Sequence, residues 1–577
     1  MRLLAALLLA AAPAAATPAT DLAATLRDHW EWALATDPQL ATQVGDRRGD
    51  GKLADPSLAA ADARAATARG FVARLDRIDA AALTPPQRVD RAVLRRLLAD
   101  QIAANGFHQR AVTFTTYAGW HTDFAGLPER TPLTNAADFD SYLARLAAFP
   151  AFNRAQIDVT RAGLAAGDAQ PCAPLTGFET SIATHVVDRA EASVFYAPFL
   201  RPRPPAVPAA DWPALQARAA KLIIADVVPA YRDFLAFYTS EYRPKCRASP
   251  GVDSTPGGAA YYASRVAAET TTALTPAQVH AIGLSEVARI GTAMDKVAAQ
   301  AGYPTRAAYI AHLRTDPAGY ARTPAELLDR AAATAKAIDQ YLPKLIGRLP
   351  RLPFTIKPIP PDQAEATTTA YSEAGSVAQG RAGVFFVNTS HLDQRPFWEL
   401  PALTLHEAAP GHQTQLSLQQ EVELPPFRRH LAGFTAFVEG WALYSESLGD
   451  EVGLYDTPAK RMGRYSYEMW RACRLVVDTG IHSQGWSRER AIDYMLANTA
   501  LGRHNVEAEV NRYITWPGQA LAYKIGELTI RRLRTEAEAK LGPKFDERAF
   551  HDAVLANGAV PLDVLESQVR AWVAGQR

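Results

Sequence analysis

The chain has 577 residues, with 61 basic and 60 acidic side chains and 48% hydrophobic residues. This length is enough to bury a large core and to form roughly two to four compact units. The charges nearly cancel and no long run carries one sign, which argues against a nucleic acid or an anionic membrane surface as a partner.

The first residues have the layout of a secretory signal peptide. Met1-Arg2 is a short basic start, Leu3 to Ala12 is an uninterrupted apolar run, and Pro13 to Thr17 offers the small residues that a signal peptidase requires. The apolar run is shorter than the roughly 20 residues that span a bilayer. We expect residues 1–16 to be removed and the mature chain to be periplasmic or secreted, with no membrane attachment after cleavage. The alternative is that these residues form a Leu- and Ala-rich first helix of the fold.

The three cysteines fall into two kinds of surroundings. Cys172 and Cys246 lie in Pro-rich, loop-like sequence, and export would permit a disulfide between them, although the sequence leaves the pairing open. Cys473 lies in an apolar helical stretch and is expected to be a buried thiol.

Helical periodicity dominates the chain and predicts a mainly α fold. Apolar residues recur at three- and four-residue spacing in several segments, and Thr before Pro at Thr84 and Thr275 marks two helix starts. The clearest of these segments are Asp21–Ala35, Pro85–Ala103, Ala136–Ala165 and Trp212–Tyr238. We divide the mature chain into an N-terminal helical region, residues 17–270, and a catalytic helical region, residues 271–577, which could form one continuous domain.

One strand is predicted at 383–388, where a short β-branched and aromatic run is bounded by Gly and by Asn-Thr-Ser. It is either an ordinary core strand or an edge strand that hydrogen-bonds an extended peptide. In the second case Phe386 and Asn388 would contact substrate. The Pro-rich stretch from Leu349 to Asp362 is predicted to be a loop.

The segment Leu403–Gln413 (LTLHEAAPGHQ) carries the first candidate metal ligands. In the usual H-E-x-x-H pattern two His on one helical face bind zinc, and the Glu between them faces the attacking water. Here His412 is six residues beyond His406, which on a regular helix places it about 240° around the axis. Pro410 must break or bulge the helix, and Gly411 tolerates the dihedral angles that follow, so His412 could return to the metal.

A second helix, Phe437–Glu446, supplies the third candidate ligand. Glu439 and Glu446 share one face of this helix. Two His and one Glu form a catalytic zinc site that keeps one position open for water. We choose Glu439 as the ligand, because the small Gly440 beside it permits close helix packing, and Glu446 as a carboxylate behind the ligands or a ligand itself.

Further candidates lie downstream. Tyr523 and His482 are the candidates for stabilising an oxyanion, and Asp478, four residues before His482, could orient it. Arg512 could hold a substrate carboxylate, with Tyr513 beside it. We interpret His430 and His504 as structural.

The combination HEAAPGHQTQ (406–415), EGWALYSE (439–446), DTGIH (478–482) and RYITWPGQALAYKIG (512–526) strongly resembles the bacterial domain of unknown function 885 family over essentially the whole mature chain. That family is similar to helical zinc peptidases such as carboxypeptidase Taq, thimet oligopeptidase and angiotensin-converting enzyme. The resemblance implies a helical fold with a central cleft and a small β-sheet on one wall. It also implies one Zn²⁺ on His406, His412 and Glu439, with Glu407 as base and Tyr523 near the oxyanion. The two His residues are two positions further apart than in the better-studied relatives.

The resulting hypothesis is a zinc-dependent hydrolase that cleaves amide bonds of short peptides, with Glu407 as the general base for a zinc-activated water. A second hypothesis keeps the zinc but has a non-peptide amide or ester as substrate. A third is a non-catalytic helical periplasmic binding or scaffold protein, whose His and Glu residues are structural. The sequence does not show whether cleavage would occur near the amino end, near the carboxy end or in the interior of a peptide. It also leaves the oligomeric state open.

Overall fold

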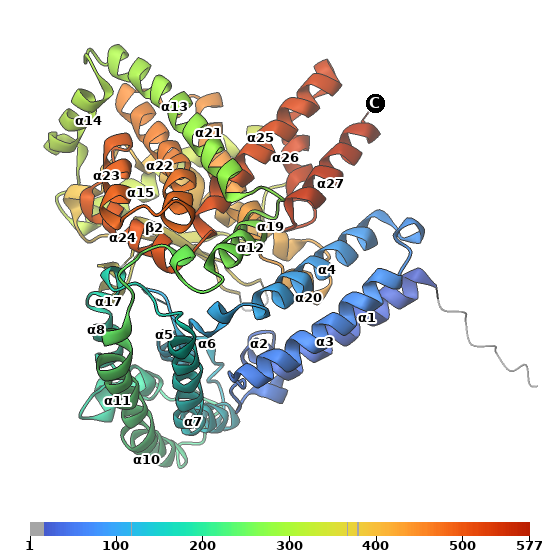
Figure 1. The fold of residues 1–577 in the computed structure, drawn as a ribbon, viewed down its shortest axis with the longest axis vertical. Helices are drawn as coiled ribbons and strands as arrows, with labels where there is room; N and C mark the ends of the chain where they lie inside the picture. Colours follow the sequence, from blue (N-terminus) through green and yellow to red (C-terminus); the bar gives the residue numbers. More distant parts are fainter. Residues whose placement is uncertain (1–16, 117, 366, 378–379, 577) are drawn as a thin grey trace, which may run out of the picture.

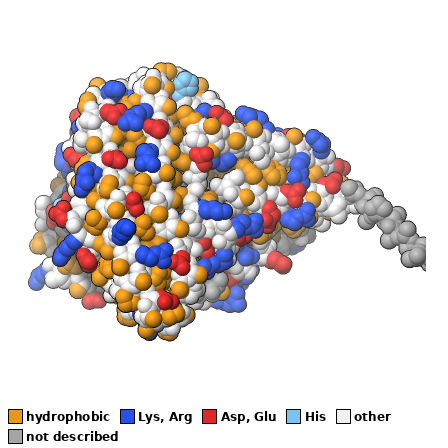
Figure 2. Space-filling model, turned by 90° about the horizontal axis from the view of Figure 1, so that it is seen from below, with side chains coloured by type: hydrophobic (Ala, Val, Ile, Leu, Met, Phe, Trp, Pro, Cys, Tyr) orange, Lys and Arg blue, Asp and Glu red, His pale blue; other side chains and the backbone are white. Residues whose placement is uncertain are grey.

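The computed structural model describes residues 17–116, 118–365, 367–377 and 380–576, and the expected signal peptide lies outside the described residues. The described chain is mainly helical, as predicted, and includes one three-stranded sheet (Figure 1). Within the described ranges, no helix is long and apolar enough to cross a membrane. Basic and acidic side chains are interspersed on the face drawn in Figure 2, in keeping with the balanced charge.

The first long helices lie side by side, and the one that follows Thr84 begins where predicted. They are α1 (Pro18–Thr36), α3 (Leu58–Arg77) and α4 (Pro85–Asn105) (Figure 1). Their buried side chains, such as Leu94, share one hydrophobic cluster with C-terminal residues such as Ile530. One hydrophobic cluster therefore spans the division near residue 270.

A second group of helices surrounds an aromatic cluster that includes Phe149, Tyr231 and Phe234. These helices are α5 (Trp120–Ala125), α7 (Ala136–Ala166), α8 (Phe178–Ala183), α10 (Trp212–Leu222) and α11 (Val228–Phe237). The predicted helix at 212–238 is interrupted by a π-helical turn, Ile223–Val227. A disulfide joins Cys172 to Cys246 beside this group.

The remaining helices form the largest group, and α13 packs along α22 (Figure 1). Thr275 caps α13 as predicted, because its hydroxyl accepts from the Gln278 N–H and the Gln278 side chain accepts from the Thr275 N–H. Cys473 is buried on α22, as expected. The helices are α12 (Gly258–Thr270), α13 (Pro276–Gln300), α14 (Arg306–Thr315), α15 (Pro324–Asp339), α18 (Leu400–Glu407), α19 (His412–Glu421), α21 (Thr435–Glu451), α22 (Pro458–Ser483), α23 (Arg488–Asn498), α24 (Arg503–Thr515), α25 (Ala522–Leu541), α26 (Glu547–Leu555) and α27 (Leu562–Gly575).

The sheet has the strand order β1-β3-β2, with β1 (Phe354–Pro358) parallel and β2 (Ala370–Glu373) antiparallel to β3 (Gly383–Val387). The predicted strand is β3, but the interpretation of it as an edge strand is wrong, because both of its sides are paired. The segment predicted as a loop at 349–362 contains β1. A Pro-rich sequence conceals this strand, which lies at the edge of the sheet, where Pro is tolerated.

Candidate metal centre

The helix that carries His406 breaks as the Pro-Gly pair predicts. Helix α18 ends at Glu407 and α19 begins at His412. At Gly411 a Cβ atom would lie 2.0 Å from the His406 carbonyl oxygen, so only Gly fits this turn. The Trp441 indole N–H donates to the Pro410 carbonyl oxygen at 2.9 Å and holds the turn against α21. The break brings the two His rings together, with centroids 4.9 Å apart and planes at 88°.

Glu439, whose side chain is 18% exposed, completes a largely buried triad with these two His residues. Its Oε2 lies 3.4 Å from His406 Nε2 and 3.3 Å from His412 Nε2. Ligands around a tetrahedral zinc ion at 2.0–2.1 Å are separated by about 3.3 Å, which matches both distances. Glu439 Oε2 is buried and has no hydrogen-bond partner among the described residues. These three side chains therefore fit a zinc ion. They offer nitrogen and oxygen donors, Glu439 Oε2 lies at ligand spacing from both imidazoles, and this buried oxygen has no other hydrogen-bond partner in the described chain to satisfy it.

Glu446 lies behind the triad and orients its first ligand. Its Oε1 is 2.9 Å from His406 Nδ1, and Arg471 lies 3.4 Å from the same oxygen. A hydrogen bond from Nδ1 leaves Nε2 with its lone pair directed at the triad. Burial alone would lower the pKa of His406, but Glu439 and Glu446 outweigh it and raise the pKa to about 9.

Ser372 supports Glu407 and was not predicted from the sequence. Its hydroxyl lies 2.9 Å from Glu407 Oε2 and 2.6 Å from the Glu407 carbonyl oxygen. Ser372 belongs to β2, which Gln413 ties to the start of α19 by donating to the carbonyl oxygens of Glu373 and Val384, both at 3.1 Å. Within the sequence, the polar run around Ser372 carries no signal of this contact.

Tyr523 reaches the triad from the start of α25. Its ring lies nearly parallel to that of His406, with centroids 6.5 Å apart, and its hydroxyl accepts from Arg512 at 3.2 Å. The Arg474 guanidinium lies 4.1 Å from the centroid of the same ring. Helices α21 and α25 approach closely where Gly440 meets Gly526, as the small residue beside Glu439 predicts.

His482 lies in the interior, and both of its ring nitrogens have protein partners. Nδ1 accepts from the Val252 N–H at 3.1 Å, and Nε2 donates to the Tyr513 carbonyl oxygen at 2.9 Å. Burial lowers the pKa of His482 to about 3. Because no ring nitrogen remains for substrate, we withdraw the assignment of His482 to the oxyanion.

Asp478 does not orient His482, contrary to the expectation. It accepts instead from the Tyr262 hydroxyl at 2.6 Å and from the Gly518 N–H at 3.1 Å. Burial raises the pKa of Asp478 to about 7. Asp478 therefore anchors the turn that precedes α25, the helix of Tyr523.

Two predicted substrate contacts are also interior groups. The Tyr513 hydroxyl donates to Glu509 at 2.6 Å and accepts from Arg474 and Trp470. Asn388 is fully buried and donates to three carbonyl oxygens of the segment 364–368. Neither side chain has a polar group left for substrate, so both assignments are corrected to structural ones.

The other two predicted contacts differ in their surroundings. Phe386 stacks on Tyr371 across the sheet, with centroids 4.8 Å apart, and is partly exposed. Arg512 lies closer to the triad, since it bonds the Tyr523 hydroxyl, and it also pairs with Glu509 and Gln519.

The family model described as "bacterial protein of unknown function (DUF885)" matches residues 38–569. The chain belongs to this family. A structure of a "putative lipoprotein" from Colwellia psychrerythraea is 27% identical, with a TM-score of 0.88 over 97% of this chain and 100% of that one. A second protein so named, of unknown function and from Shewanella oneidensis, is 20% identical and shares the fold, with a TM-score of 0.72 over 96% of this chain and 99% of that one. No curated protein matches the sequence significantly.

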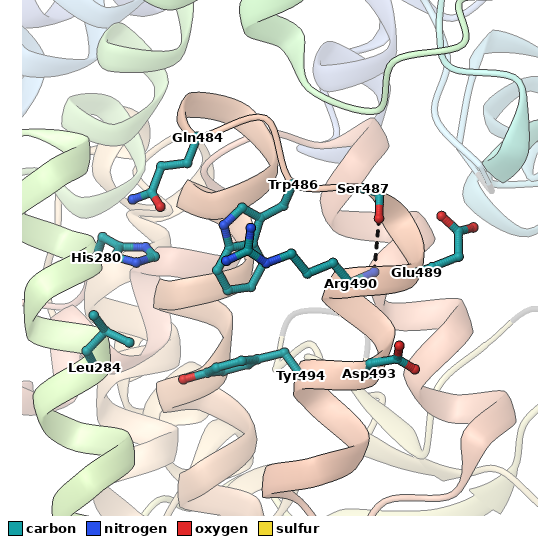
Figure 3. A pocket seen from close by; sticks show the side chains of 9 residues that line it. All are labelled: His280, Leu284, Gln484, Trp486, Ser487, Glu489, Arg490, Asp493 and Tyr494. Carbon is teal, nitrogen blue, oxygen red and sulfur yellow. Dashed lines mark hydrogen bonds between the residues drawn. The ribbon is translucent and has the colours of Figure 1, made fainter.

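A surface pocket of this DUF885 protein lies away from the triad residues, between α13 and α23 (Figure 3). Arg490 and Trp486 both line the pocket, and the Arg490 guanidinium lies 4.0 Å from the centroid of the Trp486 ring. His280 on its wall bonds Thr479 at 2.8 Å. None of the triad or its supporting residues lines this pocket.

Proposed function

We propose that this protein is an exported, zinc-dependent metallopeptidase-like hydrolase that cleaves amide bonds of short peptides. The observation that carries the proposal is Glu439 Oε2, which faces two imidazole nitrogens at 3.3 and 3.4 Å without a hydrogen bond. A structural His–Glu pair would be expected at hydrogen-bond distance, about 2.7–2.9 Å for charged partners. A zinc ion bound by His406, His412 and Glu439 would polarise the scissile carbonyl and acidify a water molecule.

The residues around the triad then have separate tasks. Glu407 accepts a proton from the attacking water and delivers it to the nitrogen of the leaving amine, so the carboxylate is regenerated in each cycle. The Ser372 hydroxyl donates to Glu407 and limits its rotation. The Tyr523 hydroxyl donates to the oxygen of the tetrahedral intermediate, and Arg512 holds that hydroxyl in place.

Two observations support export. A disulfide joins Cys172 and Cys246, and structural disulfides persist in oxidising compartments. The similar structure at 27% identity is of a protein named as a "putative lipoprotein", and lipoproteins are exported. Residues 1–16 would then serve to direct the chain out of the cytoplasm.

The experiment that tests the function measures zinc content and peptide hydrolysis on the same preparations. Wild type should hold zinc in the triad and cleave members of a library of short peptides. His412→Ala and Glu439→Ala should lose both properties, because each removes a ligand. Glu407→Gln should keep the zinc and lose hydrolysis by a factor of at least about 100, the scale of general base catalysis.

The Glu407→Gln variant separates the metal from the chemistry. Zinc in the wild type without hydrolysis of any peptide would favour a non-peptide amide or ester as the substrate. If the wild type took up no zinc, or if its zinc uptake did not depend on His412 and Glu439, the proposed function would be refuted. The hypothesis of a non-catalytic binding or scaffold protein would then remain.

A further inference from the structure

A second group of two His and one Glu lies at the surface, apart from the buried triad. Glu365 follows α17 (Pro361–Ala364) and leads toward β2, His391 follows β3, and His504 lies in the first turn of α24. His391 Nε2 is 2.9 Å from Glu365 Oε2, and His504 Nε2 is 3.4 Å from Glu365 Oε1. The two His rings have centroids 4.8 Å apart. One atom of each residue lies within 4.8 Å of the other two.

The donor set and the exposure suit an exchangeable ion. The side chains of Glu365, His391 and His504 are 69%, 37% and 35% exposed, so solvent can fill further coordination positions. Imidazole and carboxylate together favour zinc and its neighbours in the first transition series over Ca²⁺ or Mg²⁺, which prefer oxygen ligands. The His504–Glu365 separation of 3.4 Å is that of two ligands on one zinc ion, about 3.3 Å, whereas His391 and Glu365 are at hydrogen-bond distance and would move apart when an ion binds.

The backbone around the group is held in position. Asn388 donates to the carbonyl oxygens of Ala364, Thr367 and Thr368, which fixes the segment of Glu365 against the segment of His391. His391 itself has φ 48° and ψ 58°, a left-handed conformation that a residue with a Cβ adopts at a cost. Such conformations persist where the surroundings hold them, and they concentrate at functional sites.

We propose that Glu365, His391 and His504 form a second binding site for a divalent transition-metal ion, which zinc occupies. The ion would join three segments that are distant in sequence and would anchor the chain just before β2. Since β2 carries Ser372, the site would stabilise the strand that supports Glu407. Affinity is lower than in the buried triad, because the side chains of this site are exposed to solvent.

The test is a zinc titration of the metal-free mature protein by calorimetry, with zinc content determined after dialysis against zinc. Wild type should show a weaker binding event in addition to that of the buried triad. His391→Ala and His504→Ala should each weaken this event at least tenfold, and Glu365→Gln should weaken it as well. His430→Ala is the matched control, because His430 is also an exposed histidine, stacked on Trp30.

His412→Ala distinguishes this site from the proposed catalytic one. The weaker event should persist in His412→Ala, and zinc should raise the melting temperature of that variant but not of His391→Ala/His412→Ala. If the buried triad bound no zinc, the weaker event would remain and would still depend on His391. Zinc uptake in His391→Ala and His504→Ala equal to that of His430→Ala would overturn the proposal.

Discussion

The contact between α21 and α25 places Tyr523 next to the triad, and Gly440→Ala tests it. A Cβ atom on Gly440 would lie 2.6 Å from the Cα and carbonyl carbon of Gly526 and 3.0 Å from the backbone nitrogen of Glu527, where an ordinary contact is 3.4–4 Å. All three are backbone atoms, so no side-chain rotation can relieve the clash. The two helices must separate, which moves Tyr523 on α25 away from Glu439 on α21.

The expected loss of stability in Gly440→Ala follows from comparison with a second helical glycine. Gly70 lies within α3 and has no heavy atom within 4 Å of the position of an added Cβ. Gly70→Ala should therefore leave the protein more stable by up to about 1 kcal/mol, the difference in helix propensity. Gly440→Ala has the same propensity gain but adds an overpacking cost of about 1–3 kcal/mol. The free energy of unfolding should thus be about 1–3 kcal/mol lower in Gly440→Ala than in Gly70→Ala.

The assay is urea unfolding followed by far-ultraviolet circular dichroism, under conditions where refolding is complete. Zinc affinity and peptide hydrolysis are measured on the same two variants, and both should fall in Gly440→Ala alone. Equal stability and equal zinc affinity of the two variants would refute the reasoning, because it would mean that α21 and α25 are not in backbone contact at Gly440.

Three further predictions concern single side chains. Ser372→Ala should lower the hydrolysis rate about tenfold or more while zinc content stays constant; an unchanged rate would show that Glu407 is oriented by other groups. Tyr523→Phe should lower kcat by about 100-fold with little change in KM, and a change in KM alone would mean that the hydroxyl binds the ground state. His482, with a pKa of about 3 instead of 6.5, stays neutral in the folded protein at pH values where the unfolded chain binds a proton. Stability should therefore rise with pH between these values, by up to about 1.4 kcal/mol per pH unit from this group, and His482→Gln should flatten the slope of the free energy of unfolding against pH. An unchanged slope would mean that His482 is already charged in the folded state.

Local chemistry explains the features that the sequence predicts well. Thr before Pro begins α13 because the cap and the missing N–H act within one helical turn. In the same way, Pro410 cannot donate to the His406 carbonyl and Gly411 has no side chain to clash, so the break between α18 and α19 follows from adjacent residues. The family resemblance, in turn, rests on four motifs that can be read without coordinates.

Contacts between distant segments determine the features that the sequence did not predict. The predicted strand is central because β1 and β2, which have weak strand signals, pair with both of its sides. Ser372 reaches Glu407, and His391 meets His504, only because the folded chain brings together segments that are 35 and 113 residues apart in sequence. His482 and Asn388, in contrast, are structural and not part of the candidate site. Their side chains form hydrogen bonds with interior groups, which leaves them no polar atom for a substrate. Such partners depend on the path of the whole chain, so motif spacing determined the ligand candidates and tertiary packing decided which side chains surround them.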